Sequence, residues 1–305
     1  MKQEFYSNGK LLITGEYLVL DGAKAFALPT KFGQNLLIDE GKNQEITWKS
    51  YDSDGKIWFE ENISFAEISS FKIPEMESVK TTLLEILHQA FLLNPDFLKT
   101  SKGYTITTQL TFPRKWGLGT SSTLINNIAQ WLQIDAFELL NNSFGGSGYD
   151  IACAQNNFPI LYHLEQGKAV VEKITFAPEF SQNIYFVYLN KKQNSKSSIA
   201  KYRTNKSFKP EKTIEKIDAL TQVLLHTNDL NLFSETINAH EALMSHVLET
   251  STVKETLFPD FEGAIKSLGA WGGDFIMVVA KEDPSHYFSS KGFDTIITYK
   301  DMILS

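Results

Sequence analysis

The chain is 305 residues long, with 42% hydrophobic and 21% charged residues and a formal net charge of −7 at pH 7. This length exceeds the ~100–200 residues of a usual single domain, so we expect two domains with sizeable cores. The acidic balance argues against nonspecific nucleic-acid binding, which needs a basic surface. No apolar run approaches the ~18–20 residues of a membrane span, and the single cysteine, Cys153, allows no internal disulfide, so we expect a cytoplasmic protein that binds no membrane.

The first part of the chain alternates between strand and helix patterns. Apolar runs predict strands at residues 10–14, 26–28, 35–39 and 104–112. Residues 44–51 and 56–60 predict a hairpin, because Asp54 and Gly55 form a strong turn signal between them. Residues 79–92 repeat apolar side chains at helical spacing and predict a helix.

Residues 113–123, which read Pro-Arg-Lys-Trp-Gly-Leu-Gly-Thr-Ser-Ser-Thr, form the most informative stretch. Gly117 and Gly119 allow a sharp turn and a close approach of the backbone to a ligand. Three hydroxyl residues follow where an amphipathic helix begins, among unpaired N–H groups at the positive end of its dipole. This arrangement predicts an anion site for a triphosphate, although a glycine turn with a capped helix gives the same local pattern. The stretch is neither a P-loop nor a dinucleotide fingerprint.

The remaining chain mixes both element types without a regular βαβ period, which predicts an α+β fold. We expect a hairpin near residues 163–171, strands at 184–189, 275–280 and 295–299, and helices at 214–225 and 230–248. Pro, Ser and Asn interrupt the pattern at residues 178–182, which predicts domains at 1–179 and 180–305.

Three other segments share the glycine-rich character of residues 113–123. Residues 8–20 place Lys10 on an apolar strand, residues 145–152 present Asp150 on a glycine approach, and residues 266–280 form a glycine loop before an apolar strand. In this order the four segments resemble the GHMP small-molecule kinases, which include galactokinase, homoserine kinase, mevalonate kinase and phosphomevalonate kinase. The resemblance covers nearly the whole chain. It implies a ribosomal protein S5 domain 2-like N-terminal domain, a ferredoxin-like C-terminal domain, and ATP and Mg²⁺ as cofactors.

The resemblance also implies roles for single residues. The ATP-binding residues would be Gly117, Leu118, Gly119, Thr120, Ser121 and Ser122. Ser122 would contribute to the magnesium site, but the first serine of the family motif matches either Thr120 or Ser121, which leaves the register open by one residue. Glu138 lies near the position of the metal-binding glutamate of mevalonate kinases, with a solvated helical Glu as the alternative. Asp150 would orient the acceptor and take its proton, and Lys10 would pair with Asp150. The alternatives are a helix N-cap for Asp150 and a solvated strand-end lysine for Lys10.

The acceptor side most resembles the phosphomevalonate kinases. The triplet Gly15-Glu16-Tyr17 and the ending Gly272-Gly273-Asp274 both match that branch. Residues 190–198 contain several ammonium and hydroxyl donors, which suit an extra phosphate on the acceptor. The alternative is that these residues form an exposed basic loop with no role in binding. The substrate-binding residues we expect are Glu16, Tyr17, Ser147, Lys191, Lys192, Lys196, Ser197, Gly272, Gly273 and Asp274.

Several functions remain open at this point. The first is phosphomevalonate kinase, and the second is mevalonate kinase or another GHMP kinase acting on a sugar or homoserine. The third is a non-catalytic sensor, which the joint presence of Lys10, Ser122 and Asp150 argues against. The partner is a small-molecule acceptor in the first two cases, and the protein is a monomer or homodimer. His240 and Glu241 lack the second histidine of a zinc-protease motif, so we expect the histidines to serve packing or the surface.

Overall fold

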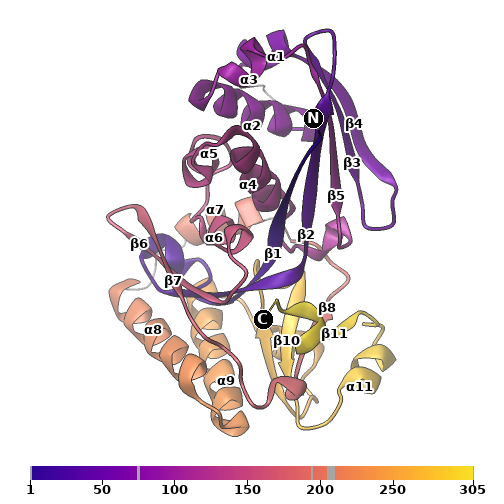
Figure 1. The fold of residues 1–305 in the computed structure, drawn as a ribbon. Coiled ribbons are helices and arrows are strands. Elements are labelled where there is room, and N and C mark those ends of the chain that lie inside the picture. Colours follow the sequence, from indigo (N-terminus) through magenta and orange to yellow (C-terminus); the bar gives the residue numbers. More distant parts are fainter. Residues whose placement is uncertain (1, 74–75, 194, 205–209, 305) are drawn as a thin grey trace. The chain divides into compact units, whose positions relative to one another are not determined.

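The computed structural model describes residues 2–73, 76–193, 195–204 and 210–304, without the side chains of residues 195–197 and 201. Two compact units are present (Figure 1). Unit 1 comprises Met1–Gly9, Phe32–Arg114 and Leu118–Gln155, and unit 2 comprises Lys10–Lys31, Lys115–Gly117 and Asn156–Ser305. Strands β1 (Gln3–Thr14) and β2 (Ala25–Glu40) therefore contribute residues to both units.

Unit 1 contains a mixed sheet in the order β4-β3-β5-β2, and β1 also pairs with β2. Its strands are β3 (Glu45–Tyr51), β4 (Ile57–Ser64), β5 (Tyr104–Leu110) and the second half of β2. Strands β3 and β4 form the predicted antiparallel hairpin, whereas β3 and β5 run parallel. Alternate residues of β3 are buried, as period-two patterning requires for a sheet with one covered face.

Helices complete unit 1, and most of its core lies between them and the sheet. They are α1 (Phe65–Ser69), α2 (Val79–Leu93), α3 (Asp96–Lys99), α4 (Thr120–Leu132), α5 (Ala136–Ser143) and α6 (Tyr149–Gln155). A core cluster joins Trp48 and Ile106 of the sheet to Leu87 of α2 and Ile125 of α4.

Buried hydrogen bonds fix α4 against the strands of unit 1. The Ser7 hydroxyl of β1 donates to Asn127 Oδ1 at 2.7 Å and accepts from Asn126 Nδ2 at 2.8 Å. Asn127 Nδ2 also donates to the backbone oxygen of Gln34 in β2 at 2.9 Å. Buried polar groups need such partners, so these bonds define the position of α4 within the unit.

Unit 2 contains an antiparallel sheet in the order β11-β8-β10-β9, and its residues 25–27 of β2 pair with the hairpin of β6 and β7. Its strands are β6 (Ile160–Glu165), β7 (Lys168–Lys173), β8 (Ile184–Tyr188), β9 (Ala264–Ser267), β10 (Phe275–Val279) and β11 (Ile296–Thr298). Its helices are α7 (Ser195–Thr204), α8 (Pro210–His226), α9 (Leu230–Leu248), α10 (Val253–Leu257), α11 (Ser285–Ser290) and α12 (Tyr299–Met302). Short 3₁₀ turns lie at Leu18–Asp21, Arg114–Trp116 and Ser181–Asn183.

The structure confirms the α+β class and most predicted elements, with three local differences. The predicted strands at 26–28 and 35–39 form one strand, β2, that passes through Pro29. The predicted basic loop at 190–198 contains the start of α7, and β9 was not predicted because it is short and contains Lys266. Cys153 is buried and forms no disulfide. The domain division at residue 179 stays a prediction.

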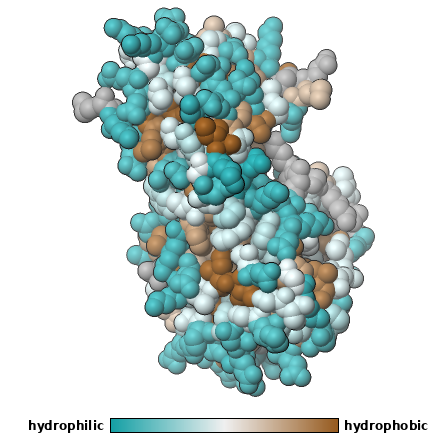
Figure 2. All heavy atoms as spheres, turned by 90° about the vertical axis from the view of Figure 1, so that its right-hand side faces the viewer, coloured by the Kyte–Doolittle hydropathy of each residue, from teal (hydrophilic) through white to brown (hydrophobic). Residues whose placement is uncertain are grey.

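Hydrophilic residues cover most of the face drawn in Figure 2, with apolar residues in smaller groups among them. Among the helices that the structure describes, none is both long enough and apolar enough to span a membrane.

Candidate functional site

The start of α4 in unit 1 has the geometry of an anion site. Gly119 is the N-cap, with φ 103° and ψ 40°, and no side chain caps the helix. The first bond of the helix runs from the Thr123 amide to the Gly119 oxygen at 2.9 Å, so the amides of residues 120–122 precede the helical ladder. First-turn amides and the helix dipole together favour an anionic ligand at a helix start of this kind. The prediction that the helix begins at Thr120 is confirmed.

The hydroxyls at this helix start differ in what they can bind. Ser122 is buried, and its hydroxyl donates to the Gly119 oxygen at 2.9 Å. Because that proton is committed, the oxygen retains only acceptor capacity, which suits a hard cation such as Mg²⁺. Thr120 and Ser121 are half-buried at the same turn. Thr123 is tied to the sheet, since its hydroxyl bonds Gln34 Oε1 at 2.7 Å.

Glu138, the second predicted metal residue, lies on a different helix from Ser122. Ser122 is buried in the first turn of α4, whereas Glu138 is exposed in the first turn of α5, which begins after α4 has ended. That Glu138 contacts the metal stays a prediction.

Asp150 occupies the first turn of α6 in unit 1. The first bond of α6 runs from the Ala152 amide to the Gly148 oxygen at 3.1 Å, so Asp150 lies inside the helix and is not its N-cap. Its Oδ1 accepts from the Ile151 amide at 3.1 Å, and the residue is half-buried. Ser147 precedes Gly148, whose φ of 91° needs a glycine. Helix α6 packs against α4.

In unit 2, Lys10 and Asp274 meet at the backbone of Gly117. Lys10 Nζ donates to the Gly117 oxygen at 3.2 Å. A Cβ added to Gly117 would lie 2.4 Å from Asp274 Cγ, so the carboxylate lies directly against this glycine. Burial raises the pKa of Asp274, while the nearby charges of Lys10 and Lys192 oppose that shift. The predicted ATP-binding glycine is thus packed between a cation and a carboxylate.

Asp274 also belongs to the segment that ends the third glycine loop. Its φ is 53°, its Oδ1 accepts from the Gln193 amide at 3.2 Å, and its own amide donates to the Lys191 oxygen at 2.7 Å. A Cβ on Gly273 would lie 2.4 Å from Gln193 Cγ, so this loop and residues 191–193 are in close contact. The structure therefore brings Lys191 and Lys192 close to the loop of Gly272, Gly273 and Asp274, and the substrate-binding role of these five residues stays a prediction. Lys191 and Lys192 are exposed, and the side chains of Lys196 and Ser197 lie outside the described part of the chain.

The predicted substrate residue Glu16 is buried in an ionic cluster, with 1% of its surface exposed. Its Oε1 accepts from Lys266 Nζ, and its Oε2 lies 3.5 Å from His240 Nε2. In this structure the carboxylate therefore faces protein groups and not solvent. Sequence reasoning missed Lys266, although a lysine beside Ala264 and Ile265 at the start of an apolar strand is the signal that could have found it.

Tyr17, next to Glu16, contacts two other segments of unit 2. Its hydroxyl accepts from the Trp271 amide at 3.4 Å, and its ring stacks on Tyr202 of α7 at 5.5 Å between centroids. Burial raises the pKa of the Tyr17 hydroxyl. Trp271 lies in the glycine loop before Gly272, so the predicted acceptor residues Tyr17 and Gly272 belong to adjoining segments.

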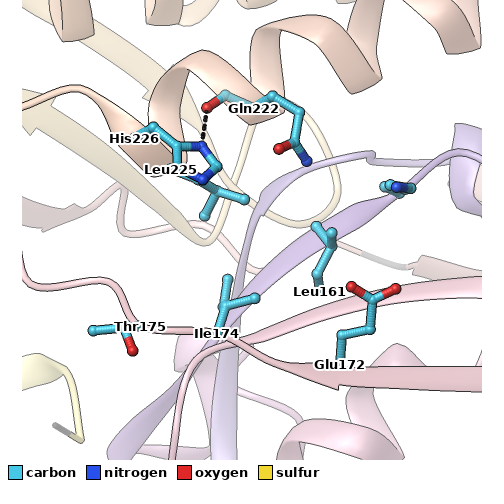
Figure 3. A pocket seen from close by; sticks show the side chains of 8 residues that line it. Leu161, Glu172, Ile174, Thr175, Gln222, Leu225 and His226 are labelled. Carbon is cyan, nitrogen blue, oxygen red and sulfur yellow. Dashed lines mark hydrogen bonds between the residues drawn. The ribbon is translucent and has the colours of Figure 1, made fainter.

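A separate hollow of unit 2 contains none of the predicted site residues. This cavity of about 560 Å³ lies between α8 and the β6–β7 hairpin (Figure 3). Its lining combines the apolar side chains of Leu161, Ile174 and Leu225 with the titratable side chains of Glu172 and His226. The His226 ring nitrogen Nδ1 is bonded to the Gln222 oxygen at 2.8 Å.

Comparisons with known proteins identify the fold. No protein-family model matches the sequence, and no curated protein sequence matches it. The structure is similar to mevalonate kinase from Methanococcus jannaschii, with a TM-score of 0.69, 15% identity, and coverage of 100% of this chain and 99% of that one. It is similar to Streptococcus pneumoniae phosphomevalonate kinase in complex with phosphomevalonate and AMPPNP, with a TM-score of 0.71, 15% identity, and coverage of 97% and 99%.

A third similar structure is Lactococcus lactis galactokinase complexed with galactose, with a TM-score of 0.67, 15% identity, and coverage of 95% of this chain and 88% of that one. These proteins act on different acceptors but share one fold over nearly their whole length. The predicted two-domain GHMP kinase fold is therefore confirmed.

Proposed function

We propose that this chain, which has the fold of the GHMP kinases, is an ATP-dependent kinase of a small-molecule acceptor. The observation that carries the proposal is the start of α4, where Gly119 leaves the first-turn amides without a side-chain cap. Phosphoryl transfer requires that the phosphates be held, their charge offset and the acceptor aligned, with little covalent help from the protein. A helix start behind two glycines supplies the hold.

The nucleotide-binding residues in this proposal are Gly117, Leu118, Gly119, Thr120, Ser121 and Ser122. The Thr120 and Ser121 hydroxyls and the first-turn amides would donate to phosphate oxygens. Ser122 would hold Mg²⁺ through its oxygen, since its proton is already donated to Gly119. When bound, Mg²⁺ neutralises charge on the phosphates, and it commonly keeps several waters and few protein ligands.

Asp150 and Lys10 carry the chemical roles. Asp150 would orient the acceptor hydroxyl and take its proton, with its carboxylate oriented by the Ile151 amide. Lys10 would offset charge that develops on the transferred phosphoryl group. Its ammonium is held at the base of the nucleotide-binding stretch by the Gly117 oxygen.

Phosphomevalonate is the acceptor that we favour, which would place the enzyme in the mevalonate pathway. Lys191 and Lys192 are exposed beside the Asp274 segment, and two cations suit an acceptor that already bears a phosphate. Mevalonate kinase is a candidate because its fold is equally similar. It comes second because its acceptor lacks the phosphate that these two lysines would bind.

A coupled assay of ADP release tests the proposal. The purified chain is incubated with ATP and Mg²⁺ and with mevalonate, phosphomevalonate, homoserine or galactose, and a reaction without acceptor gives the background. We expect turnover above background with phosphomevalonate. Turnover with mevalonate alone would reverse the choice of acceptor. ATP binding without turnover of any acceptor would favour the non-catalytic sensor.

A further inference from the structure

Four titratable side chains of unit 2 converge in the interior next to the Gly15–Tyr17 turn. They are Glu16, His240, Glu241 and Lys266, and each has at most 3% of its surface exposed. Lys266 Nζ donates to Glu16 Oε1, lies 3.1 Å from Glu241 Oε1 and donates to the Ser267 oxygen at 2.7 Å. The Ser267 hydroxyl donates to Glu241 Oε2 at 3.0 Å. One ammonium thus serves two carboxylates from separate parts of the chain.

Burial of these charges is costly unless they stay together. Burial raises the pKa of Glu16 to about 7, against the opposing charge of Lys266. Burial and Lys266 both lower the pKa of His240, so its ring is neutral near pH 7. With neutral His240, Lys266 is the cation that compensates Glu16 and Glu241. Removal of the ammonium alone would leave the carboxylates uncompensated in the interior. Such a change destabilises a protein more than replacement of both members of a buried ion pair.

The cluster holds a turn with unusual backbone conformations on both sides of Glu16, of which that of Tyr17 is strained. Gly15 has φ 87°, and a Cβ there would lie 2.8 Å from backbone atoms of Lys24 and Ala25. Tyr17 has φ 59° and ψ −45°, a combination that a residue with a side chain rarely adopts. Such a conformation persists only where the surroundings enforce it. The fixed carboxylate of Glu16 on one side and buried Leu18 on the other provide that enforcement.

Tyr17 then reaches the glycine loop and α7. Its hydroxyl accepts from the Trp271 amide, and its ring stacks on Tyr202, whose own hydroxyl bonds Asp21. A shift of the turn would therefore change the position of Tyr17 relative to Trp271 and Gly272. These contacts connect a buried ammonium to the residues expected to surround the acceptor.

We propose that Lys266 is a positioning residue: its buried ammonium fixes Glu16 and thereby holds Tyr17 against the glycine loop on the acceptor side of the site. The acceptor assignment rests on the proposed kinase function, whereas the positioning of the turn does not. Glu241 assists because it shares the same ammonium, and Glu16 acts through the turn without touching the acceptor.

The test compares Lys266→Met with the double variant Lys266→Met/Glu16→Gln, in which Glu241 is the one carboxylate of the cluster that loses the ammonium and it keeps the Ser267 hydroxyl as a donor. The double change therefore guards better against simple unfolding than Lys266→Met alone. Lys254→Met is the matched control, because Lys254 is a half-buried lysine of the same unit that donates to the Gly263 oxygen at 2.6 Å and is not part of the cluster. Hydrogen exchange reports the turn directly, through the amides of Leu18, Val19 and Leu20 that bond within it.

In the folded double variant we expect at least tenfold faster exchange at these amides, with the rest of unit 2 unchanged and the Lys254→Met control as wild type. Unchanged exchange in the double variant would overturn the positioning role whatever the protein's activity. With the acceptor identified by the ADP assay, we expect its KM to rise about tenfold or more, while the KM for ATP stays within about twofold. A wild-type acceptor KM together with a loosened turn would overturn the link to the acceptor. Failure of the wild-type chain to turn over any acceptor would count against the proposed function alone, because the exchange result does not depend on turnover.

Discussion

Gly117→Ala probes the contact between the nucleotide-binding stretch and Asp274. Gly117 has φ 71°, and an added Cβ would lie 2.4, 2.5 and 2.6 Å from the Cγ, Oδ2 and Oδ1 atoms of Asp274. The carboxylate cannot turn away freely, because Oδ1 accepts from the Gln193 amide and the Asp274 backbone amide is bonded to the Lys191 oxygen. Something must therefore move when the methyl group is added.

Two costs contribute to the expected loss of stability. A left-handed backbone costs a residue with a Cβ roughly 1–2 kcal/mol relative to glycine. Overpacking a filled site costs a further ~1–3 kcal/mol. We therefore expect Gly117→Ala to lower the free energy of unfolding by about 2–5 kcal/mol and to weaken ATP binding, since the stretch at 117–122 must shift.

Gly145→Ala is the matched control, because Gly145 has φ 72° but nothing within 4 Å of an added Cβ. Gly145→Ala should lower the free energy of unfolding only by the backbone contribution of roughly 1–2 kcal/mol. Urea unfolding of both variants measures the difference, and the double variant Gly117→Ala/Asp274→Ala should recover the overpacking part. If Gly117→Ala is no less stable than Gly145→Ala, the reasoning about Asp274 is refuted.

The remaining predictions concern the nucleotide, the chemical step, the acceptor and pH. Gly119→Val should severely weaken ATP binding, because a valine does not easily adopt φ 103° and its branched side chain would occupy the space of the phosphates. Nucleotide titration of the folded variant measures the affinity for ATP, and a wild-type value would contradict the site. Asp150→Asn should retain ATP affinity while kcat falls ~10²–10⁴-fold, and near-normal turnover with a verified acceptor would exclude the role as base. Lys191→Ala and Lys192→Ala should each raise KM for a phosphorylated acceptor roughly ten- to a hundredfold, as expected for a charge-assisted contact of ~1.5–3 kcal/mol, and leave KM for ATP unchanged; an equal effect on an unphosphorylated acceptor would argue against phosphate recognition. Glu16 has its pKa raised from 4.5 to about 7, so its protonated form stabilises the fold below pH 4.5, and this contribution is lost as pH rises to about 7. Wild type should therefore lose roughly 2–3 kcal/mol relative to Glu16→Gln between pH 5 and 8 in urea unfolding, and parallel curves for the two proteins would refute the shift.

Local signals explain why the nucleotide-binding stretch could be predicted. Two glycines followed by three hydroxyl residues and an amphipathic run specify a turn and a helix start within about ten residues. The structure places the first residue of α4 at Thr120, where the sequence pattern predicts it. The same holds for the β3–β4 hairpin, whose Asp-Gly turn is encoded next to the strands that it joins.

Partners that are distant in sequence could not be predicted in this way. Lys266 lies 250 residues after Glu16, and no local pattern indicates that the two side chains meet. The motif alone made Glu16 a substrate contact, and only the packing of β9 and α9 shows that its carboxylate faces inward. The contact of Asp274 with Gly117 depends in the same way on the meeting of two glycine-rich segments.

Backbone strain in unit 2 falls on residues that we propose for acceptor binding. Among residues with described backbone, the positive-φ positions other than glycine are Tyr17, Asn43, Gln44, Gln133, Gln166, Asn190, Glu249 and Asp274. Six of them are exposed, at positions where an asparagine, glutamine or glutamate ends a helix or a turn, and only Tyr17 and Asp274 are not exposed. Strain away from the surface is retained where function needs it and packing enforces it. Each of these two residues lies beside a buried carboxylate or carries one, and each contacts the glycine loop that ends at Asp274. The two strained positions that are not exposed are therefore both residues that we propose for acceptor binding, which supports that part of the proposal.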